Sequence, residues 1–253
     1  MKLYNIVFSP TGGTKKVSAL LTDALEGEAA NVDLTDSKQN FRTVQLTQED
    51  IAVISVPSYG GRAPAVAVKR LTMLRGQGAR AVLVCVYGTR AYEDTLVEKE
   101  DAAKQAGFRV SAAVAAIAEH SIARQFAAGL PDTQDVKQLS DFARQIQRKL
   151  SAEDSTEPTI PGNRPYKKAG GAGMVPKPTK ECTKCGACAA ECPVQAIDKE
   201  NPKKVDEKAC ISCMRCISVC PHSARKVNPV MLAAASLMLK KVCSERKDCQ
   251  LFL

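Results

Sequence analysis

Aromatic side chains, histidines and long hydrophobic runs are all scarce in this sequence of 253 residues. It contains no tryptophan, 4% aromatic residues in total and two histidines. No basic stretch is interleaved with aromatic residues, as proteins that bind single-stranded nucleic acid require, so we expect no nucleic-acid function. The longest apolar run, Val230 to Leu239, is well short of the ~20 residues that a helix needs to span a bilayer. The first eight residues lack the features of a signal peptide and are typical of a short apolar strand.

Cysteine is abundant, with eleven residues, and eight of them form two copies of one pattern. The first copy is Cys182-x2-Cys185-x2-Cys188-x3-Cys192-Pro193, and the second, 28 positions later, is Cys210-x2-Cys213-x2-Cys216-x3-Cys220-Pro221. The first three thiolates of a copy can surround one iron–sulfur cube, because each two-residue gap permits a tight turn. The fourth cysteine precedes a proline that ends the turn, so it points away and can complete the other cube.

Residues 180–227 therefore resemble the bacterial two-cluster ferredoxins, in which the fourth cysteine of each run serves the other cluster. The resemblance implies one [4Fe–4S] cluster on Cys182, Cys185, Cys188 and Cys220. It implies a second on Cys210, Cys213, Cys216 and Cys192. One departure is that Gly186 of the first copy corresponds to Met214 in the second. This difference predicts unequal hydrogen bonding to the clusters and unequal potentials.

Two other interpretations of the cysteines remain open. Zinc favours four ligands, usually from two separated Cys-x2-Cys pairs rather than consecutive triplets. A disulfide scaffold would need an oxidising compartment. Because no export signal is recognisable, we expect a reducing interior, the cytoplasm, where cysteines bind metal or stay free. Cys85 is expected to be an inert core thiol, and Cys243 and Cys249 to be free thiols.

Residues 1–150 alternate apolar β-branched runs with amphipathic segments, which is typical of an open parallel α/β sheet. The predicted strands are Leu3–Phe8, Ala30–Leu34, Ile51–Val56, Ala81–Tyr87 and Arg109–Ile117. The predicted helices are Lys15–Leu25, Ala63–Leu74, Tyr92–Ala106 and Thr133–Leu150. This spacing fits a flavodoxin-like five-stranded sheet of order 2-1-3-4-5, with ligands bound beyond the carboxyl ends of the strands.

The first strand end is followed by Ser9-Pro10-Thr11-Gly12-Gly13-Thr14. Small residues, hydroxyls and a helix N-terminus can together hold an anion. No Gly-Lys-Ser/Thr follows at the spacing of a Walker loop, and a plain structural turn is the alternative. The stretch from Phe8 to Lys16 resembles the phosphate loop of flavodoxins, Ser/Thr-x-Thr-Gly-x-Thr, which implies a site for the FMN phosphate.

Two further strand ends place tyrosine beside glycine, which offers a ring for stacking and a backbone that can approach a flat cofactor. Flavodoxins hold their flavin ring between two such loops. The resemblance therefore assigns Tyr59, Gly60 and Gly61 to one side of the ring. It assigns Tyr87, Gly88, Arg90 and Tyr92 to the other, with Arg62 and Arg90 tuning the flavin. The alternative makes Tyr87 a core residue and Tyr92 a packing residue at the start of a helix.

The remaining segments predict how the parts are connected. Residues 151–178 form a linker rich in proline, with the flexible stretch Gly170-Gly171-Ala172-Gly173. Within it, residues 163–168 are specific enough in sequence that Tyr166 is expected to dock near the cofactor. Residues 179–228 form the ferredoxin domain. Residues 229–253 begin with a helix, Pro229–Val242, which we expect to pack across the junction between the domains.

Nearly the whole chain is similar to fused flavodoxin/ferredoxin proteins. The resemblance implies FMN and two [4Fe–4S] clusters, electron exchange between them, and redox proteins as partners. With these groups bound, the formal charge of +9 falls to roughly +3. An FMN-dependent reductase of a quinone or nitro compound is the alternative, for which Glu119 and His120 are the candidate acid–base pair. A redox sensor that binds a partner is a third interpretation.

Overall fold

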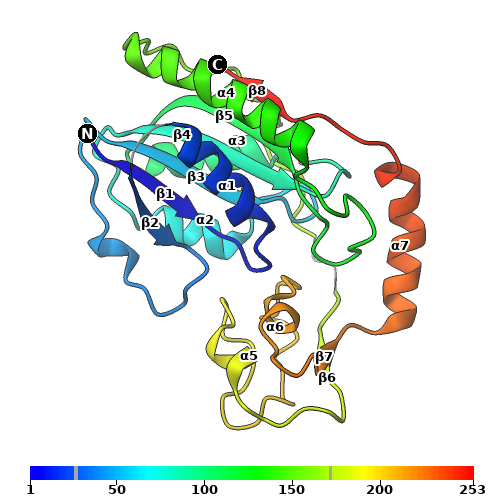
Figure 1. Ribbon diagram of the computed structural model, residues 1–253. Coiled ribbons are helices and arrows are strands. Elements are labelled where there is room, and N and C mark those ends of the chain that lie inside the picture. The colour runs from blue at the N-terminus through cyan, green and yellow to red at the C-terminus, as the bar shows by residue number, and fades with distance from the viewer. Residues whose placement is uncertain (26–27, 171–172) are drawn as a thin grey trace.

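Five segments rich in valine, isoleucine and alanine form parallel strands in the computed structural model, which describes residues 1–25, 28–170 and 173–253 (Figure 1). The strands are β1 (Leu3–Val7), β2 (Ala29–Asp33), β3 (Ile51–Pro57), β4 (Arg80–Tyr87) and β5 (Arg109–Ile117). They lie in the order β2-β1-β3-β4-β5, and each pairing among them is parallel. The flavodoxin-like order expected from the sequence is therefore confirmed.

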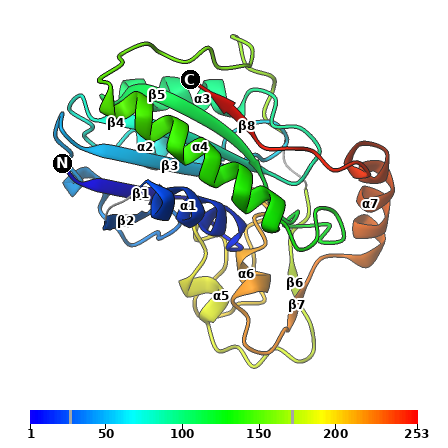
Figure 2. The ribbon, with the colours of Figure 1, turned by 45° about the horizontal axis from the view of Figure 1, so that its top comes forward.

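Helices cover both faces of this sheet, because its central strands are apolar on both sides. On one face, α1 (Gly13–Ala24) and α4 (Thr133–Ser151) bury side chains such as Val17, Leu21 and Leu139. On the other, α2 (Ala65–Leu71) and α3 (Thr95–Gln105) bury Leu71, Leu96 and Ala103. Figure 2 shows α1 and α4 in front of the sheet. A short 3-10 turn, η1 (Phe41–Thr43), lies between β2 and β3.

The C-terminal tail adds a further strand that the sequence did not predict. In the described part of the chain, β8 (Gln250–Phe252) extends the sheet to six strands and pairs antiparallel with β5. Leu251 and Phe252 pack against the cores on opposite faces of the sheet. Three residues are too few to show a hydrophobic period, so only the tertiary pairing identifies this strand.

Residues 177–226 form a smaller unit near the carboxyl ends of the sheet strands (Figure 1). β6 (Lys177–Pro178) and β7 (Arg225–Lys226) pair antiparallel and enclose two short helices, α5 (Ala187–Ala190) and α6 (Arg215–Ser218). The residue before each helix has a left-handed backbone, with φ of 77° at Gly186 and 62° at Met214. Met214 is therefore a strained non-glycine residue, and the backbone has the same conformation in both copies.

The long connection between α4 and β6 runs without helix or strand through its described residues. Gly171 and Ala172, part of the stretch predicted to be flexible, lie outside the described residues. The docking of residues 163–168 is described below with the site.

The last helix, α7 (Pro229–Cys243), begins at Asn228, whose side chain accepts hydrogen bonds from the N–H groups of Val230 and Met231. We expected it to pack across the junction between domains, and this is wrong. Val230, Leu237 and Met238 are 75%, 71% and 75% exposed, and Cys243 is the residue of α7 that is buried. The helix stands beside the body of the molecule and connects the small unit to β8 (Figure 1). Helix propensity predicted the helix but contains no information on its docking. No helix among the described residues combines the length and apolar character needed to cross a bilayer.

Candidate functional site

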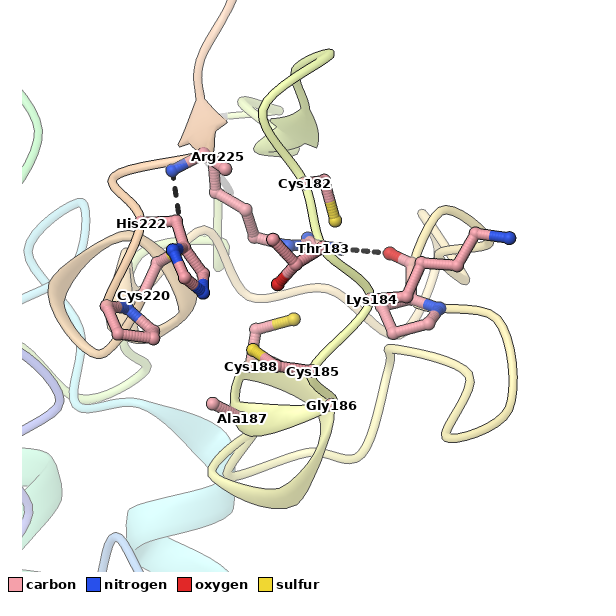
Figure 3. Close-up of a pocket in the computed structure, with 13 residues that line it drawn as sticks. Cys182, Thr183, Lys184, Cys185, Gly186, Ala187, Cys188, Cys220, His222 and Arg225 are labelled. Atoms are coloured by element: carbon pink, nitrogen blue, oxygen red, sulfur yellow. Dashed lines mark hydrogen bonds between the residues drawn. The ribbon is translucent and has the colours of Figure 1, made fainter.

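The eight cysteines of the repeated pattern line two separate hollows in the small unit. One hollow contains the first cysteine group, Cys182, Cys185, Cys188 and Cys220 (Figure 3). The other contains the second cysteine group, Cys192, Cys210, Cys213 and Cys216. Each group takes three thiols from one run and one from the other, so the structure brings together the four cysteines of each predicted set. Across residues 1–25, 28–170 and 173–253, no three Cys, His, Asp or Glu side chains are close enough to share a single metal ion.

The two cysteine groups differ in exposure. Cys185 of the first group is exposed, whereas Cys192, Cys213 and Cys216 of the second are buried. Burial raises the pKa of the Cys213 thiol to about 12 and that of Cys216 to about 11. The positive charge of Arg225 works against the shift at Cys216.

The loop after β1 leads directly into the N-terminus of α1. Gly12 has φ of 94°, which glycine adopts without strain, and α1 begins at the next residue. Ser9 holds the loop in place: its hydroxyl accepts a hydrogen bond from the Lys15 N–H at 2.9 Å, and its own N–H donates to the Thr35 hydroxyl at 2.7 Å. The first turn of α1 contains no acidic residue, so the positive end of the helix dipole faces the loop unopposed.

The loop after β3 folds into a tight turn. Tyr59 and Arg62 exchange two backbone hydrogen bonds of 2.9 and 3.2 Å across Gly60 and Gly61, whose φ values are 62° and 85°. Burial raises the pKa of the Tyr59 phenol, and the charge of the Cys213 thiolate adds to the shift. Tyr59 is therefore close enough to Cys213 of the second cysteine group for an electrostatic interaction.

The loop after β4 uses its aromatic rings differently from the stacking role that we expected. Tyr87 is 7% exposed and belongs to the core, with its ring centroid 5.2 Å from that of Tyr92 in an edge-to-face contact. The Tyr92 hydroxyl donates to the Gln250 side chain at 2.5 Å. Both rings are thus in the packing arrangement that the sequence left open as the alternative. Gly88 is pressed against His120, since a Cβ there would lie 2.7 Å from the His120 Cβ.

The two arginines expected to tune the flavin are both paired with carboxylates. Arg62 contacts Glu98 at 2.7 Å. Arg90 contacts Glu93 at 2.7 Å, and Glu93 also binds Lys167 at 2.6 Å. Their charges are therefore largely compensated inside the protein.

The candidate acid–base pair of the reductase interpretation is also engaged within the protein. The Nδ1 atom of His120 accepts hydrogen bonds from the N–H groups of Ile122 and Ala123 at 3.2 and 3.1 Å. Burial lowers the pKa of His120, and the charge of Arg90 adds to this. Glu119 pairs with Arg124. His120 thus stabilises a turn in its neutral form.

Residues 163–168 of the linker dock beside these loops, as the sequence suggested. Asp94, at the start of α3, accepts hydrogen bonds from the N–H groups of Asn163 and Lys167 at 2.8 and 2.7 Å. The Arg62 guanidinium lies over the Tyr166 ring, 4.8 Å from its centroid. The Tyr166 hydroxyl donates to Asp101. The linker is therefore fixed to the N-terminal domain before it reaches the small unit.

The second cysteine group lies at the junction between the two units. Arg215 donates to the carbonyl of Pro10 in the loop after β1 at 3.3 Å, and Arg70 of α2 donates to the carbonyl of Pro193 at 2.6 Å. Ile211 packs against the core of the sheet. The residues of these contacts in the small unit, Pro193, Ile211 and Arg215, all line the hollow of the second cysteine group. This group is therefore the one that faces the loops after β1 and β3.

Sequence reasoning missed Arg215 and Arg225, which line the hollow of the second cysteine group. The signal was present in the repeat, because the first copy has Ala187 and Ile197 at these positions. It also missed the hydrogen bond between Gln250 and Tyr92 and those that Asp94 accepts from the linker. No local sequence pattern indicates these contacts.

Comparisons with known proteins agree with the cysteine pattern. Residues 181–224 match the family model of the 4Fe-4S dicluster domain. Ferredoxin-2 of Chlorobaculum tepidum is 40% identical over 55 residues, which is 19% of this chain and 89% of that protein. The ferredoxin-like protein in the nif region of Sinorhizobium fredii is 46% identical over 48 residues, 16% of this chain and 75% of that protein.

Among solved structures, the flavodoxin of Streptococcus pneumoniae TIGR4 superposes with a TM-score of 0.41 at 20% identity, covering 60% of this chain and 99% of that one. The strand order and parallel pairing of the sheet are themselves flavodoxin-like. Through residues 181–224 the chain belongs to the 4Fe-4S dicluster ferredoxins, here fused to a flavodoxin-like domain.

Proposed function

We propose that this chain is an electron-transfer protein that holds two [4Fe–4S] clusters and one FMN and exchanges electrons with separate redox proteins. When bound, the clusters would pass electrons singly and FMN would take one or two, so their combination would couple one-electron to two-electron partners. The observation that carries the proposal is the junction. Arg215, which lines the hollow of the second cysteine group, contacts the loop after β1 at Pro10, and Ile211 of the same hollow packs against the core of the sheet.

In this proposal each cysteine group holds one cluster. The family match to a 4Fe-4S dicluster domain supports clusters over zinc or a disulfide scaffold. The first group, with its exposed Cys185 and the exposed Lys184 beside it, would be the one that a donor or acceptor protein approaches. The second group, at the junction, would exchange electrons with the flavin.

The N-terminal domain would hold FMN at the carboxyl ends of β1, β3 and β4. The phosphate would bind at Ser9–Thr14, where Gly12 and Gly13 expose backbone N–H groups at the start of α1. The ring would lie against Tyr59, Gly60 and Gly61 on one side and against Gly88 and Arg90 on the other. Tyr87 and Tyr92 would support the second loop from behind, because their rings pack on each other.

Anaerobic purification with iron, sulfide and flavin quantified against protein tests the proposal. We expect roughly eight irons, eight sulfides and one FMN per chain, and flavin absorbance that bleaches after the clusters are reduced. Cys213→Ser should slow flavin reduction, whereas Cys85→Ser, a change at a buried core thiol, should leave its rate unchanged. A colourless preparation, a zinc-only protein, or a flavin that stays oxidised beside reduced clusters would contradict it.

A further inference from the structure

The two copies of the cysteine pattern differ in charge at two positions that face the second cysteine group. Superposing the copies by their 28-residue offset places Arg215 opposite Ala187 and Arg225 opposite Ile197. Both arginines line the hollow of the second cysteine group. The second copy therefore brings two arginines where the first has apolar side chains. Glu191 partly compensates the charge of Arg215, whereas Arg225 forms no ion pair within the described residues.

Arg225 is the more deeply buried of the two. It is 2% exposed and lines the hollows of both cysteine groups. Figure 3 shows its side chain extending from β7 in among the residues that surround the first cysteine group. Its Nη1 donates to the carbonyl of Pro176 at 3.1 Å, and its Nη2 donates to the carbonyl of Pro202. Within the described residues, its Nε is buried and has no hydrogen-bond partner.

Arg215 shows the same feature at the junction. One of its terminal nitrogens donates to Glu191 at 2.5 Å and the other to the carbonyl of Pro10 at 3.3 Å. Its Nε is also buried without a partner among the residues that the structure describes. A buried guanidinium N–H without a partner is unfavourable, unless a negative group occupies the hollow beside it.

We propose that Arg225, assisted by Arg215, is the electrostatic partner of the cluster on the second cysteine group and raises its reduction potential. The proposal rests on the proposed function, since it requires clusters in the two hollows. A cubane with four thiolates carries a charge of about −2 and becomes more negative on reduction. A fixed positive charge in a medium of low dielectric constant therefore stabilises the reduced state more than the oxidised one, as does an N–H donated to sulfur.

The positive charge beside the second cysteine group compensates for the burial of its thiols. Three of the four thiols in the second cysteine group are buried, which disfavours the additional negative charge of the reduced cluster, whereas the first group has the exposed Cys185. Burial therefore disfavours electron transfer from the first group to the second. The charge of Arg225 offsets part of this cost, and Arg215 lies at the junction with the loop after β1.

The test is an anaerobic potentiometric titration, followed by EPR, of the holoprotein and of Arg225→Ile, which installs the residue of the first copy. We expect at least a tenfold decrease in the equilibrium constant for one-electron reduction of the second cluster, a shift of about 59 mV to more negative potential. Arg215→Ala should shift the same cluster in the same direction, but less, because Arg215 is partly exposed. Lys226→Met, a change at the adjacent exposed residue of β7, is the matched control and should leave both potentials unchanged.

Iron and sulfide analysis distinguishes a failure of the proposed function from a failure of the role proposed for Arg225. A wild-type protein without clusters would overturn the proposed function. A protein with about eight irons whose Arg225→Ile potentials equal those of the wild type would overturn this inference alone.

A measurement on the unmodified protein covers the case in which Arg225→Ile fails to fold. In partly reduced protein labelled with 15N-arginine, electron spin echo modulation should show nitrogen coupled to a cluster. The coupling should persist in Arg215→Lys, which removes the other labelled candidate. Its absence from the wild type, or its loss in Arg215→Lys, would contradict the role of Arg225.

Discussion

Glycine is required at position 61 by two independent features of its surroundings. Its φ is +85°, and a Cβ built there would lie 1.6 Å from a carboxylate oxygen of Glu93. Glu93 in turn binds Arg90 and Lys167. Gly61 therefore allows the loop after β3, the loop after β4 and the linker to meet at one carboxylate.

We predict that Gly61→Ala destabilises the protein by about 2–4 kcal/mol, because it combines backbone strain with a displaced Glu93. It should also weaken FMN binding, measured by quenching of flavin fluorescence. Gly129→Ala is the matched control, since Gly129 has φ of +78° but nothing within 4 Å of its Cβ position. The control should cost only the strain, about 1–2 kcal/mol in urea unfolding. Equal losses in the two variants would contradict the role of the Glu93 contact.

For individual residues, the sequence predicted which side chains lie close together in the fold. It did not predict which of them are accessible to a ligand. The cysteine spacing implied two sets of four, and the structure brings each set together. Tyr87 and Tyr92 were expected to offer faces for stacking, but Tyr87 is buried in the core and the two rings meet edge to face. Spacing along the chain indicates that a ring lies at a strand end; whether its face is exposed depends on packing from distant segments such as Gln250.

Among the elements, the docked part of the linker depends on one carboxylate at the start of α3. Asp94 is 1% exposed and accepts the N–H groups of Asn163 and Lys167. The hydrogen bond from Lys167 is the main cause that lowers the pKa of Asp94 below its usual value of 3.8. A carboxyl with a depressed folded-state pKa contributes stability that is present above its unfolded value and is lost as pH falls through the folded value.

We therefore predict that Asp94→Asn lowers the free energy of unfolding by about 1–3 kcal/mol at pH 7, because charged acceptors form the stronger hydrogen bonds. The difference between wild type and variant should begin to shrink near the unfolded-state pKa of about 4 and continue to shrink as pH falls through the lower folded-state pKa of Asp94. Urea unfolding of both proteins at several pH values measures it. A difference that stays constant down to pH 3 would show that the carboxylate charge does not hold the linker.

The strands of the N-terminal domain were predictable within a residue or two because β3, β4 and β5 are buried on both faces and the segments are bounded by turns. β5 was predicted at its observed bounds, Arg109–Ile117. β8 and the placement of α7 were not predictable, for different reasons. β8 is defined only by its pairing with β5. α7 has strong helix formers, which made the helix itself predictable. Its apolar residues suggested that it would be buried, but within the described residues most of its apolar surface is exposed.

In the molecule as a whole, the ferredoxin unit is held to the flavodoxin-like domain at both ends and at the junction. The linker is fixed to α3 before the unit begins, and β8 joins the sheet after it ends. At the junction, Arg70 donates to the carbonyl of Pro193 at 2.6 Å and to that of Leu34 at 2.7 Å, and its guanidinium lies 5.5 Å from the centroid of the Phe41 ring. Arg70 thus connects the loop after β2 to the wall of the second cysteine group.

Replacing Arg70 tests whether this junction sets the rate of electron exchange between the units. The charged hydrogen bond to Pro193 is worth about 1.5–3 kcal/mol, so Arg70→Met should lower the equilibrium constant for docking by about tenfold or more. We expect flavin reduction after rapid reduction of the clusters, followed by stopped-flow absorbance, to become slower because a larger fraction of the molecules is undocked. The cluster and flavin potentials should stay unchanged, because Arg70 does not line either cysteine hollow. Lys69→Met, at an exposed neighbour on the same helix, should leave the rate intact. A slow phase that appears equally in both variants, or a shifted potential in Arg70→Met, would mean that docking by Arg70 does not set the rate.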